Sequence, residues 1–355
     1  MKSIVTKLKQ LNLTTGLFLK PTAVAVDIGT AMTRFGLDEK GIVLREPTFV
    51  GKNTRTGQIL FFGNEAKDIY GKSPEYVSII KPFENSIISD FDATVALISE
   101  LLKKSIYPYY RSHLIKKGLA AYATVPTNST EVEQRALQEA LIKAGFQHAY
   151  LLEKPIASAY GADVPIFFYQ PAFVMDFGAG TVELAVITMG GIVASKVLKL
   201  GGDYMDKLIY NYLHLKYGLV VGEQTAENLK NKLFALTDSK EVFPVRGKSL
   251  ENGLPKSVRV TASDIREALA VCVNQIVDGI KELIETIPPE IIDGLIKSGI
   301  VLTGKMAHTP GLDKYISNEV KLPVIKARKP EDATILGIMK LVSEPESLKR
   351  VIIYS

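Results

Sequence analysis

The chain has 355 residues, of which 46% are hydrophobic and 23% are charged; this composition is typical of a globular protein, and the length predicts about two domains. The net charge of +5 is too small for a dedicated nucleic-acid binder, and the single cysteine, Cys272, excludes a disulfide-linked secreted fold. No apolar stretch reaches the ~20 residues that cross a bilayer, which excludes a transmembrane protein.

The first element in chain order is a basic segment. Residues 1–20 contain lysines at positions 2, 7, 9 and 20 and no acidic residue, so most of the net positive charge falls there. The apolar side chains that would share an arc of about 120° on a helix are Met1, Ile4, Val5, Leu8 and Leu11. Such a helix can bury its apolar face in a membrane while its lysines contact anionic headgroups. The alternatives are that it packs onto its own domain or forms a flexible tail.

Two turns of the same kind follow apolar strands, one in each half of the chain. Strands are expected at residues 23–27 and 33–37 around the first turn, and at residues 173–176 and 182–187 around the second. The turns read Asp27-Ile28-Gly29-Thr30-Ala31 and Asp176-Phe177-Gly178-Ala179-Gly180-Thr181. Gly and small residues let backbone N–H groups approach a phosphate, and an Asp at a strand end can hold Mg²⁺ through water. Two copies predict a duplicated α/β domain whose halves enclose one nucleoside triphosphate.

Three further segments fit a nucleotide cleft. Their candidate residues are Glu133, in the first turn of an expected helix; Glu227 and Lys230, on a later helix; and Gly304 and Lys305, after an expected strand at residues 299–303. A carboxylate in the first turn of a helix can orient a water molecule. For each acidic residue the alternative is a solvated helix face.

Taken together, these motifs resemble the actin/Hsp70/sugar-kinase superfamily and, within it, the MreB family of bacterial actins. The similarity runs from about Val24 to Leu341, and much of it lies outside the nucleotide cleft, which favours MreB over other branches of the superfamily. Characteristic stretches are Gly63-Asn64-Glu65-Ala66-Lys67, Leu152-Glu153-Lys154-Pro155, Gly201-Gly202-Asp203-Tyr204 and Gly299-Ile300-Val301-Leu302-Thr303-Gly304.

The resemblance implies an α/β, actin-like fold, in which two duplicated RNase H-like α/β domains, each with an inserted subdomain, surround a cleft for ATP and Mg²⁺. After the N-terminal segment at residues 1–20, subdomain IA is expected at residues 21–46, 80–160 and 330–355, and subdomain IB at residues 47–79. Subdomain IIA is expected at residues 161–195 and 260–329, and subdomain IIB at residues 196–259.

The resemblance also implies roles for single residues. The two phosphate loops match Asp27, Ile28, Gly29, Thr30 and Ala31, and Gly178, Ala179, Gly180 and Thr181. Asp27 and Asp176 match the residues that hold Mg²⁺ through water. Glu133 matches the carboxylate that positions the attacking water, with Thr181 and Asp176 as the other catalytic residues. The residues expected around the adenosine are Glu227, Lys230, Gly304 and Lys305.

The chain departs from the family at several of these positions. MreB proteins usually have three consecutive glycines in the second phosphate loop and in the adenosine loop; here Ala179 adds a Cβ to the former, and Lys305 and Met306 replace glycines in the latter. Val182 lacks a hydroxyl that is usual there. These changes predict ATP binding with slow or altered hydrolysis. Arg34 is expected to be a strand residue that points outward, although a phosphate-binding lysine has the corresponding position in eukaryotic actin.

A second membrane element is expected between a helix that ends near residue 104 and a strand at residue 119. MreB proteins often carry a hydrophobic loop here, and this chain has Tyr107, Tyr109 and Tyr110, whose rings suit a membrane interface. The alternative is that these tyrosines pack under the neighbouring helix.

Cys272 is expected in a helix core, and the four histidines show no metal-ligand spacing.

The resulting hypothesis is an actin-like ATPase that binds ATP and Mg²⁺ and assembles with itself into filaments, expected as paired protofilaments, that govern cell shape. It is expected in the cytoplasm, at the inner face of the cell membrane, with an anionic membrane surface, paralogues and cell-envelope morphogenesis proteins as further partners. The alternatives are a nucleotide-binding filament scaffold with little hydrolysis, and a small-molecule kinase of the same superfamily.

Overall fold

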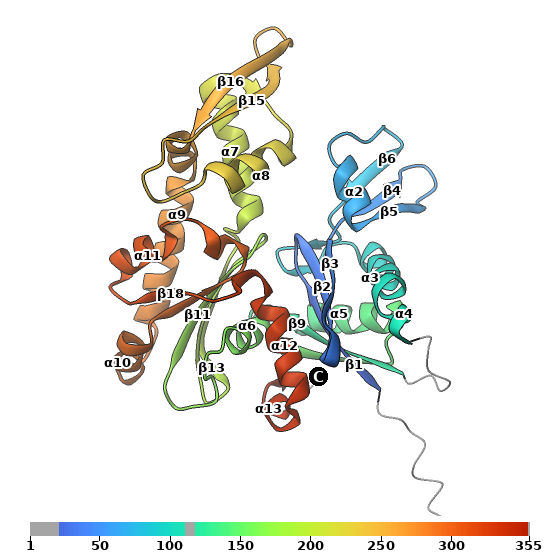
Figure 1. Ribbon diagram of the computed structural model, residues 1–355, viewed down its shortest axis with the longest axis vertical. Coiled ribbons are helices and arrows are strands. Elements are labelled where there is room, and N and C mark those ends of the chain that lie inside the picture. Colours follow the sequence, from blue (N-terminus) through green and yellow to red (C-terminus); the bar gives the residue numbers. More distant parts are fainter. Residues whose placement is uncertain (1–20, 111–117, 354–355) are drawn as a thin grey trace, which may run out of the picture.

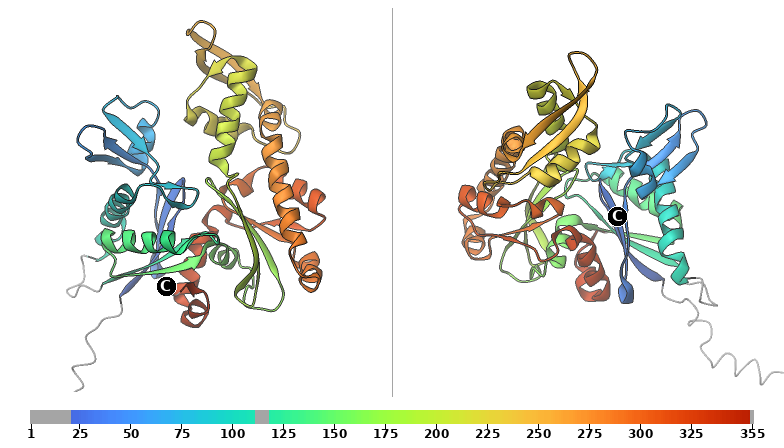
Figure 2. Two further views of the ribbon diagram at one scale, coloured as in Figure 1. Left: turned by 180° about the vertical axis from the view of Figure 1, so that it is seen from behind. Right: turned by 45° about the horizontal axis from the view of Figure 1, so that its top comes forward.

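The structure, a computed structural model, describes residues 21–110 and 118–353. Figure 1 shows two lobes, each built on a β-sheet, with the helices α6 (Lys154–Gly161) and α12 (Ala333–Ser343) between the sheets. Each lobe also carries a smaller unit, and both small units lie at the same end of the molecule (Figure 1, Figure 2).

The sheet of the first lobe has the strand order β19-β10-β9-β1-β2-β3. Its strands are β1 (Thr22–Ile28), β2 (Met32–Leu37), β3 (Gly41–Pro47), β9 (Leu119–Val125), β10 (His148–Glu153) and β19 (Ile352–Ile353). β1, β2 and β3 form an antiparallel meander, whereas β9 and β10 extend the sheet in parallel with β1. The side chains of β1 alternate between the two faces: Val24 and Val26 belong to the core of this lobe, and Ala25 belongs to the core around α6 and α12.

The sheet of the second lobe, with the order β13-β12-β11-β17-β18, repeats this plan. Its strands are β11 (Ala172–Phe177), β12 (Val182–Thr188), β13 (Gly191–Leu198), β17 (Ile300–Thr303) and β18 (Val324–Lys326). Again an antiparallel meander is extended by two parallel strands, which confirms the predicted duplication of an α/β unit. Every residue of β11 is buried, as expected for a strand that is covered on both faces.

Helices cover the outer faces of both sheets. They are α3 (Phe91–Ser105), α4 (Tyr107–Tyr110) and α5 (Glu131–Ala144) in the first lobe, and α9 (Ala262–Glu285), α10 (Pro289–Ser298) and α11 (Leu312–Val320) in the second; α13 (Pro345–Lys349) follows α12. Cys272 of α9 is fully buried in the core of the second lobe, as predicted, and burial raises the pKa of its thiol to about 12.

The small units each combine a short sheet with helices. One consists of β4 (Val50–Asn53), β5 (Ile59–Phe62), β6 (Val77–Ile80) and α2 (Gly63–Ile69). The other consists of β14 (Leu219–Val220), β15 (Val242–Ser249), β16 (Pro255–Thr261), α7 (Gly202–Tyr217) and α8 (Glu223–Leu233). Short 3₁₀ turns occur at Asp38–Lys40, Lys305–His308 and Pro330–Asp332.

The two central helices cross in direct backbone contact. A Cβ at Gly161 of α6 would lie 1.8 Å from the carbonyl oxygen of Ala333, and a Cβ at Gly337 of α12 would lie 1.8 Å from the carbonyl oxygen of Ala157. The buried hydroxyls of Ser158 and Thr334 are 2.8 Å apart at the same crossing. Because both sheets pack on this pair of helices, the crossing sets how the two lobes face each other.

Candidate functional site

The first glycine turn joins β1 to β2 and is held tightly. The N–H of Gly29 donates to the carbonyl of Met32 (2.9 Å), and the hydroxyl of Thr48 donates to the carbonyl of Gly29 (2.7 Å). A Cβ at Gly29 would lie 3.0 Å from the carbonyl oxygen of Met32, which leaves little room for a side chain. Asp27, near the end of β1, and Thr30, in the turn, are both buried.

The second turn joins β11 to β12 and is fixed to the start of α7. The N–H of Gly178 donates to the carbonyl of Thr181 (3.0 Å). The carbonyls of Gly178 and Ala179 accept from the N–H groups of Gly202 (3.1 Å) and Asp203 (2.8 Å), in the first turn of α7. The position of this turn is therefore set both by the sheet of the second lobe and by the small unit that contains α7.

The structure brings the two turns together at one place. A Cβ at Gly180 would lie 2.4 Å from the Thr30 hydroxyl oxygen, so this close approach of the turns requires glycine. The N–H of Ser86 donates to the Thr30 hydroxyl (3.2 Å), and the hydroxyls of Ser86 and Thr181 are 3.0 Å apart. Ser86 thus links the first turn to the second.

Sequence reasoning missed Ser86 and its neighbour Asn85. They form the two-residue loop between β7 (Phe83–Glu84) and β8 (Ile87–Ile88), with φ of 49° and 67°, as expected for a type I′ hairpin turn. The signal was a short polar run, Glu84-Asn85-Ser86, between apolar residues, which is weak because each flanking strand has only two residues.

Both turns offer unpaired backbone donors. The N–H groups of Thr30, Ala31, Ala179 and Gly180 donate to no acceptor among the described residues. Successive free N–H groups in a turn form an anion-binding concavity. Four donors from two turns that meet at one place fit a phosphate chain.

The prediction that Arg34 points outward is wrong. Arg34 lies directly opposite Asp27 in the antiparallel pair of β1 and β2, so the two side chains project from the same face. Its guanidinium lies 3.1 Å from Asp27 (Nη1 to Oδ2) and 3.3 Å from Asp332 (Nε to Oδ1), and the side chain is 14% exposed. Burial raises the pKa of Asp27, and Arg34 offsets part of this rise.

Lys154 is a second buried cation, to which sequence analysis assigned no role. It is the first residue of α6, directly after β10, and its Nζ lies 2.7 Å from Asp176 (Oδ2) and 3.4 Å from Glu183 (Oε1). Burial alone would lower the pKa of Lys154, but the charges of Asp176 and Glu183 outweigh it and raise the pKa. The hydroxyl of Thr303 donates to the other oxygen of Asp176 (2.9 Å). A lysine at the end of an apolar strand carries no sequence signal for these partners.

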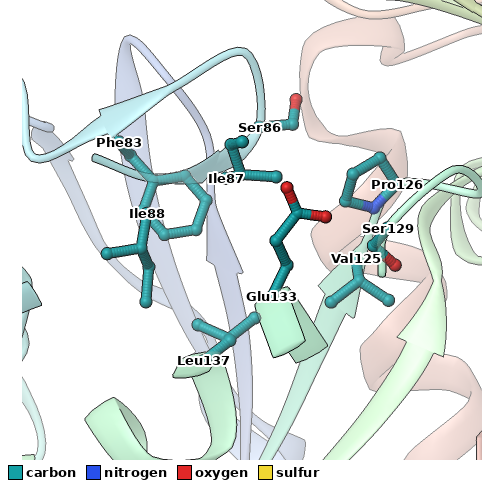
Figure 3. A pocket seen from close by; sticks show the side chains of 9 residues that line it. All are labelled: Phe83, Ser86, Ile87, Ile88, Val125, Pro126, Ser129, Glu133 and Leu137. Atoms are coloured by element: carbon teal, nitrogen blue, oxygen red, sulfur yellow. The ribbon is translucent and has the colours of Figure 1, made fainter. Parts of the chain in front are cut away.

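Glu133 has a structural role as well as an accessible position. Its Oε2 accepts a hydrogen bond from the N–H of Thr130 (2.8 Å), and the hydroxyl of Thr130 accepts one from the N–H of Glu133 (3.3 Å); these two bonds form a capping box at the start of α5. The same carboxylate, with Ser86 and Ser129, lines a cavity of about 10 Å³, enough for one water molecule (Figure 3). Since Ser86, which lines the same cavity, also contacts Thr181, this cavity lies next to the second turn.

Glu227 and Lys230 lie on α8, and both are engaged in ion pairs. The Nζ of Lys230 donates to the carbonyl of Gly202 (2.7 Å) and lies 2.8 Å from Asp206. Burial raises the pKa of Asp206 to about 6, although Lys230 opposes the rise. Glu227 lies 3.2 Å from Lys67 of α2 (Oε2 to Nζ); burial alone would raise its pKa, but Lys67, Lys230 and Lys305 together outweigh burial and lower it.

A larger cavity, of about 290 Å³, lies beside α8. Its lining residues are Lys230, Asn231, Phe234, Lys305, Met306, His308, Thr309 and Pro310. Gly304 precedes this loop with φ of 81°, and a Cβ there would lie 2.3 Å from the carbonyl oxygen of Phe177, so glycine is required. The predicted Lys230 and Lys305 therefore share a cavity, whereas Glu227 is not among its lining residues.

Contacts of α2, of Tyr70 directly after it and of Lys81 directly after β6 join the first lobe to the unit of α7 and α8; we call them the bridge. Lys67 and Tyr70 carry most of it, because both reach α8. Its contacts are Lys67 with Glu227, the Gln224 side chain with the Lys67 carbonyl (2.6 Å), Tyr70 with Glu223, and Lys81 with Asp203 (2.9 Å).

Known proteins are similar to this chain in sequence and in fold. The sequence model of the MreB/Mbl protein family matches residues 21–350. The chain belongs to the MreB/Mbl family. It is 35% identical to the cell shape-determining protein Mbl of Bacillus subtilis (strain 168) over 333 residues, which are 92% of this chain and 97% of that protein. It is 33% identical to the cell shape-determining protein MreB of Escherichia coli (strain K12) over 313 residues, 86% of this chain and 89% of that protein.

A solved structure of a family member supports the same assignment. The crystal structure of MreB5 of Spiroplasma citri bound to AMPPNP matches with a TM-score of 0.86 at 26% identity, and the match covers 93% of this chain and 98% of that one. The predicted α/β, actin-like fold is thereby confirmed for this MreB/Mbl chain.

The residues predicted to contact a membrane in this MreB/Mbl chain are placed only in part. Ile4, Val5, Leu8 and Leu11 lie outside the described residues, and Tyr110 is the last residue of α4. Tyr107 packs against the core of the first lobe, and Tyr109 is 50% exposed. None of the described helices has the length and apolar character of a membrane span. Nor do the described residues contain a cluster of three or more His, Cys, Asp or Glu that could hold a metal ion directly.

Proposed function

We propose that this protein binds ATP in the cleft between its lobes and assembles with itself into filaments, as paired protofilaments, that help to determine cell shape. The observation that carries this proposal is the meeting of the two glycine turns, with their unpaired N–H donors, at one site. The description of MreB5 of Spiroplasma citri as bound to AMPPNP and of Mbl of Bacillus subtilis as cell shape-determining supports it.

In this proposal the phosphates of ATP lie against the two turns. The free N–H groups of Thr30, Ala31, Ala179 and Gly180 would donate to phosphate oxygens. The base and ribose would occupy the cavity of about 290 Å³, beside Lys230 and Lys305. Gly304 supports this location, because its close contact with Phe177 holds the wall of the cavity against the second turn.

The proposed chemistry is in-line attack of a water molecule on the terminal phosphate, in which catalysis consists mainly of positioning and charge stabilisation. Glu133 would orient the water, since its carboxylate lines a cavity of one-water size, and the hydroxyl of Thr181 would assist through its contact with Ser86. Mg²⁺, when bound, would neutralise phosphate charge, with Asp27 and Asp176 holding it through water. Ala179 and Lys305 favour slow turnover.

Sedimentation with phosphate release tests the proposal. Purified protein is centrifuged with ATP, ADP or AMPPNP, with and without lipid, while released phosphate is measured. The proposal expects pelleting that depends on the nucleotide, together with phosphate release. Pelleting without phosphate release would instead favour a filament scaffold with little hydrolysis, and no pelleting under any condition would overturn the filament proposal.

We further propose that the protein acts in the cytoplasm, at the inner face of the cell membrane. The basic segment at residues 1–20 and the tyrosines around Tyr109 would contact anionic lipid. The support from the fold is that these two parts of the chain lead into neighbouring strands: Thr22 of β1 pairs with Leu119 of β9, and the N–H of Thr22 donates to the carbonyl of Gly118 (2.8 Å). Both would therefore reach one membrane surface.

Liposome binding tests the membrane proposal. Deletion of residues 2–11 is expected to weaken binding to vesicles that contain anionic lipid, and replacement of Tyr109 by Ser is expected to weaken it further. Vesicles of neutral lipid serve as the control. Equal binding of the full chain and the deletion variant to anionic vesicles would refute the proposal.

A further inference from the structure

Each aspartate at the phosphate turns is paired with a buried cation of the protein itself. Lys154 lies 2.7 Å from Asp176, and Arg34 lies 3.1 Å from Asp27; the two basic side chains are 13% and 14% exposed. Buried pairs of this kind are screened by salt much less than surface pairs. The carboxylate charge that would attract a divalent cation is therefore partly neutralised by Lys154 and Arg34.

Lys154 lies next to the turn that offers free N–H donors. A Cβ at Gly178 would be 3.8 Å from the Nζ of Lys154. An ammonium has three N–H donors, and the partners of this one among the described residues are Asp176 at 2.7 Å and Glu183 at 3.4 Å. One donor of Lys154 therefore remains for an oxygen that binds at the second turn.

The charges at this site decide whether a triphosphate can bind without a metal ion. Asp27, Asp176 and Glu183 by themselves would repel phosphate oxygens, and a divalent cation would be needed to overcome this repulsion. Lys154 and Arg34 remove much of the repulsion. Lysine also binds phosphate as a point charge, and its flexible stem lets the ammonium follow the ligand while the backbone of α6 stays in place.

This inference rests on the proposed nucleotide binding. We propose that Lys154 is a phosphate-binding residue of this chain: its ammonium donates to an oxygen of the nucleotide's phosphate chain and so reduces the requirement for a divalent cation in nucleotide binding. Arg34 supports it by neutralising Asp27, its neighbour on the adjacent strand of the first lobe.

The test measures the dissociation constants of ADP and AMPPNP by calorimetry, once with excess Mg²⁺ and once with EDTA. Because the protein supplies the positive charge, EDTA is expected to weaken binding to the parent protein by less than about tenfold. In Lys154→Gln, which keeps a polar side chain of similar length, EDTA is expected to weaken binding by a further factor of about 10–100, the value of one charge-assisted hydrogen bond.

Two further variants complete the test. Lys154→Arg keeps the charge and is expected to show the parent's ratio of the two dissociation constants. Lys103→Gln removes an exposed lysine that pairs with Glu100, far from the turns in sequence, and is expected to leave both constants unchanged. Thermal unfolding establishes that each variant is folded. If Lys154→Gln does not fold, the inference is tested by the ratio of the dissociation constants in EDTA and in Mg²⁺, measured for the parent protein and for Lys154→Arg.

The outcomes separate this inference from the proposed function. The inference would be overturned if EDTA raised the dissociation constant of the parent protein by more than about tenfold. It would also be overturned if the ratio of the dissociation constants in EDTA and in Mg²⁺ were the same for Lys154→Gln as for the parent. Binding that requires Mg²⁺ would contradict the role of Lys154 but leave nucleotide binding intact. Absence of binding with and without Mg²⁺ would contradict the proposed function itself.

Discussion

At the scale of single residues, Glu133 illustrates how one carboxylate can serve both the fold and the proposed reaction. It caps α5 through Thr130 and lines the small cavity next to Ser86. An alanine at this position would therefore change stability and turnover together. The two roles can be separated, because Gln also completes a capping box but is a far weaker base.

We expect Glu133→Gln to bind nucleotide as the parent protein does and to release phosphate about 100-fold more slowly, the typical contribution of a positioned acid or base. The matched control is Thr130→Ala, which removes the cap and leaves the carboxylate. It is expected to lower the free energy of unfolding by about 1 kcal/mol and to keep the rate per folded molecule. A parent-like rate in Glu133→Gln, measured by phosphate release, would remove Glu133 from the mechanism.

Asp206 provides a pH-dependent prediction. Its pKa in the folded protein is about 6, above the ordinary value of 3.8, because of burial. A raised pKa means that the folded state binds the proton more tightly, so this stabilisation is present below about pH 4 and is lost as the pH rises through 6. Between these limits the free energy of unfolding of the parent should fall by roughly 3 kcal/mol relative to Asp206→Asn. Urea denaturation at a series of pH values measures this difference, and parallel profiles for the two proteins would contradict it.

At the scale of elements, the crossing of α6 and α12 is the feature on which the site depends. We expect Gly337→Ala to reduce the free energy of unfolding by about 3 kcal/mol, since its Cβ would lie 1.8 Å from the carbonyl oxygen of Ala157 and would force the helices apart. Gly191→Ala is the control, because the nearest atom to its Cβ is 3.8 Å away, and it should change stability by less than about 0.5 kcal/mol. Similar urea midpoints for the two variants would contradict the prediction, because they would show that α6 and α12 can move apart without loss of stability.

At the scale of the whole molecule, the bridge joins the two small units in this structure. We expect the double variant Lys67→Met with Tyr70→Phe to increase the radius of gyration and to release bound nucleotide several-fold faster, up to about tenfold, because partly exposed ion pairs contribute about 0.2–1 kcal/mol each. X-ray scattering and stopped-flow displacement of a fluorescent nucleotide measure the two effects.

The control for the bridge is Lys103→Met, which breaks an exposed ion pair within α3 and should alter neither quantity. Because the pairs of the bridge are partly exposed, salt should weaken the bridge of the parent protein and bring its release rate toward that of the double variant. Unchanged scattering and unchanged release in the double variant would mean that the bridge does not control the cleft.

The sequence by itself determined the features that depend on neighbours along the chain. The strands, the two glycine turns, the start of the helix that carries Glu133 and the glycine at Gly304 follow from short apolar runs and from backbone conformations that particular residues favour or require. The repetition of one turn in each half was enough to predict the duplicated α/β plan and a shared nucleotide site.

The tertiary structure alone decided which charges meet. Arg34 faces Asp27 because the register of β1 and β2 sets them opposite each other, and this register cannot be deduced from a single strand. Lys154 contacts Asp176 and Glu183 because the start of α6 lies against the second sheet. The partners of a buried charge come from elements far apart in sequence, and burial lowers the screening between them, so the electrostatic character of the site is a property of packing and not of any local motif.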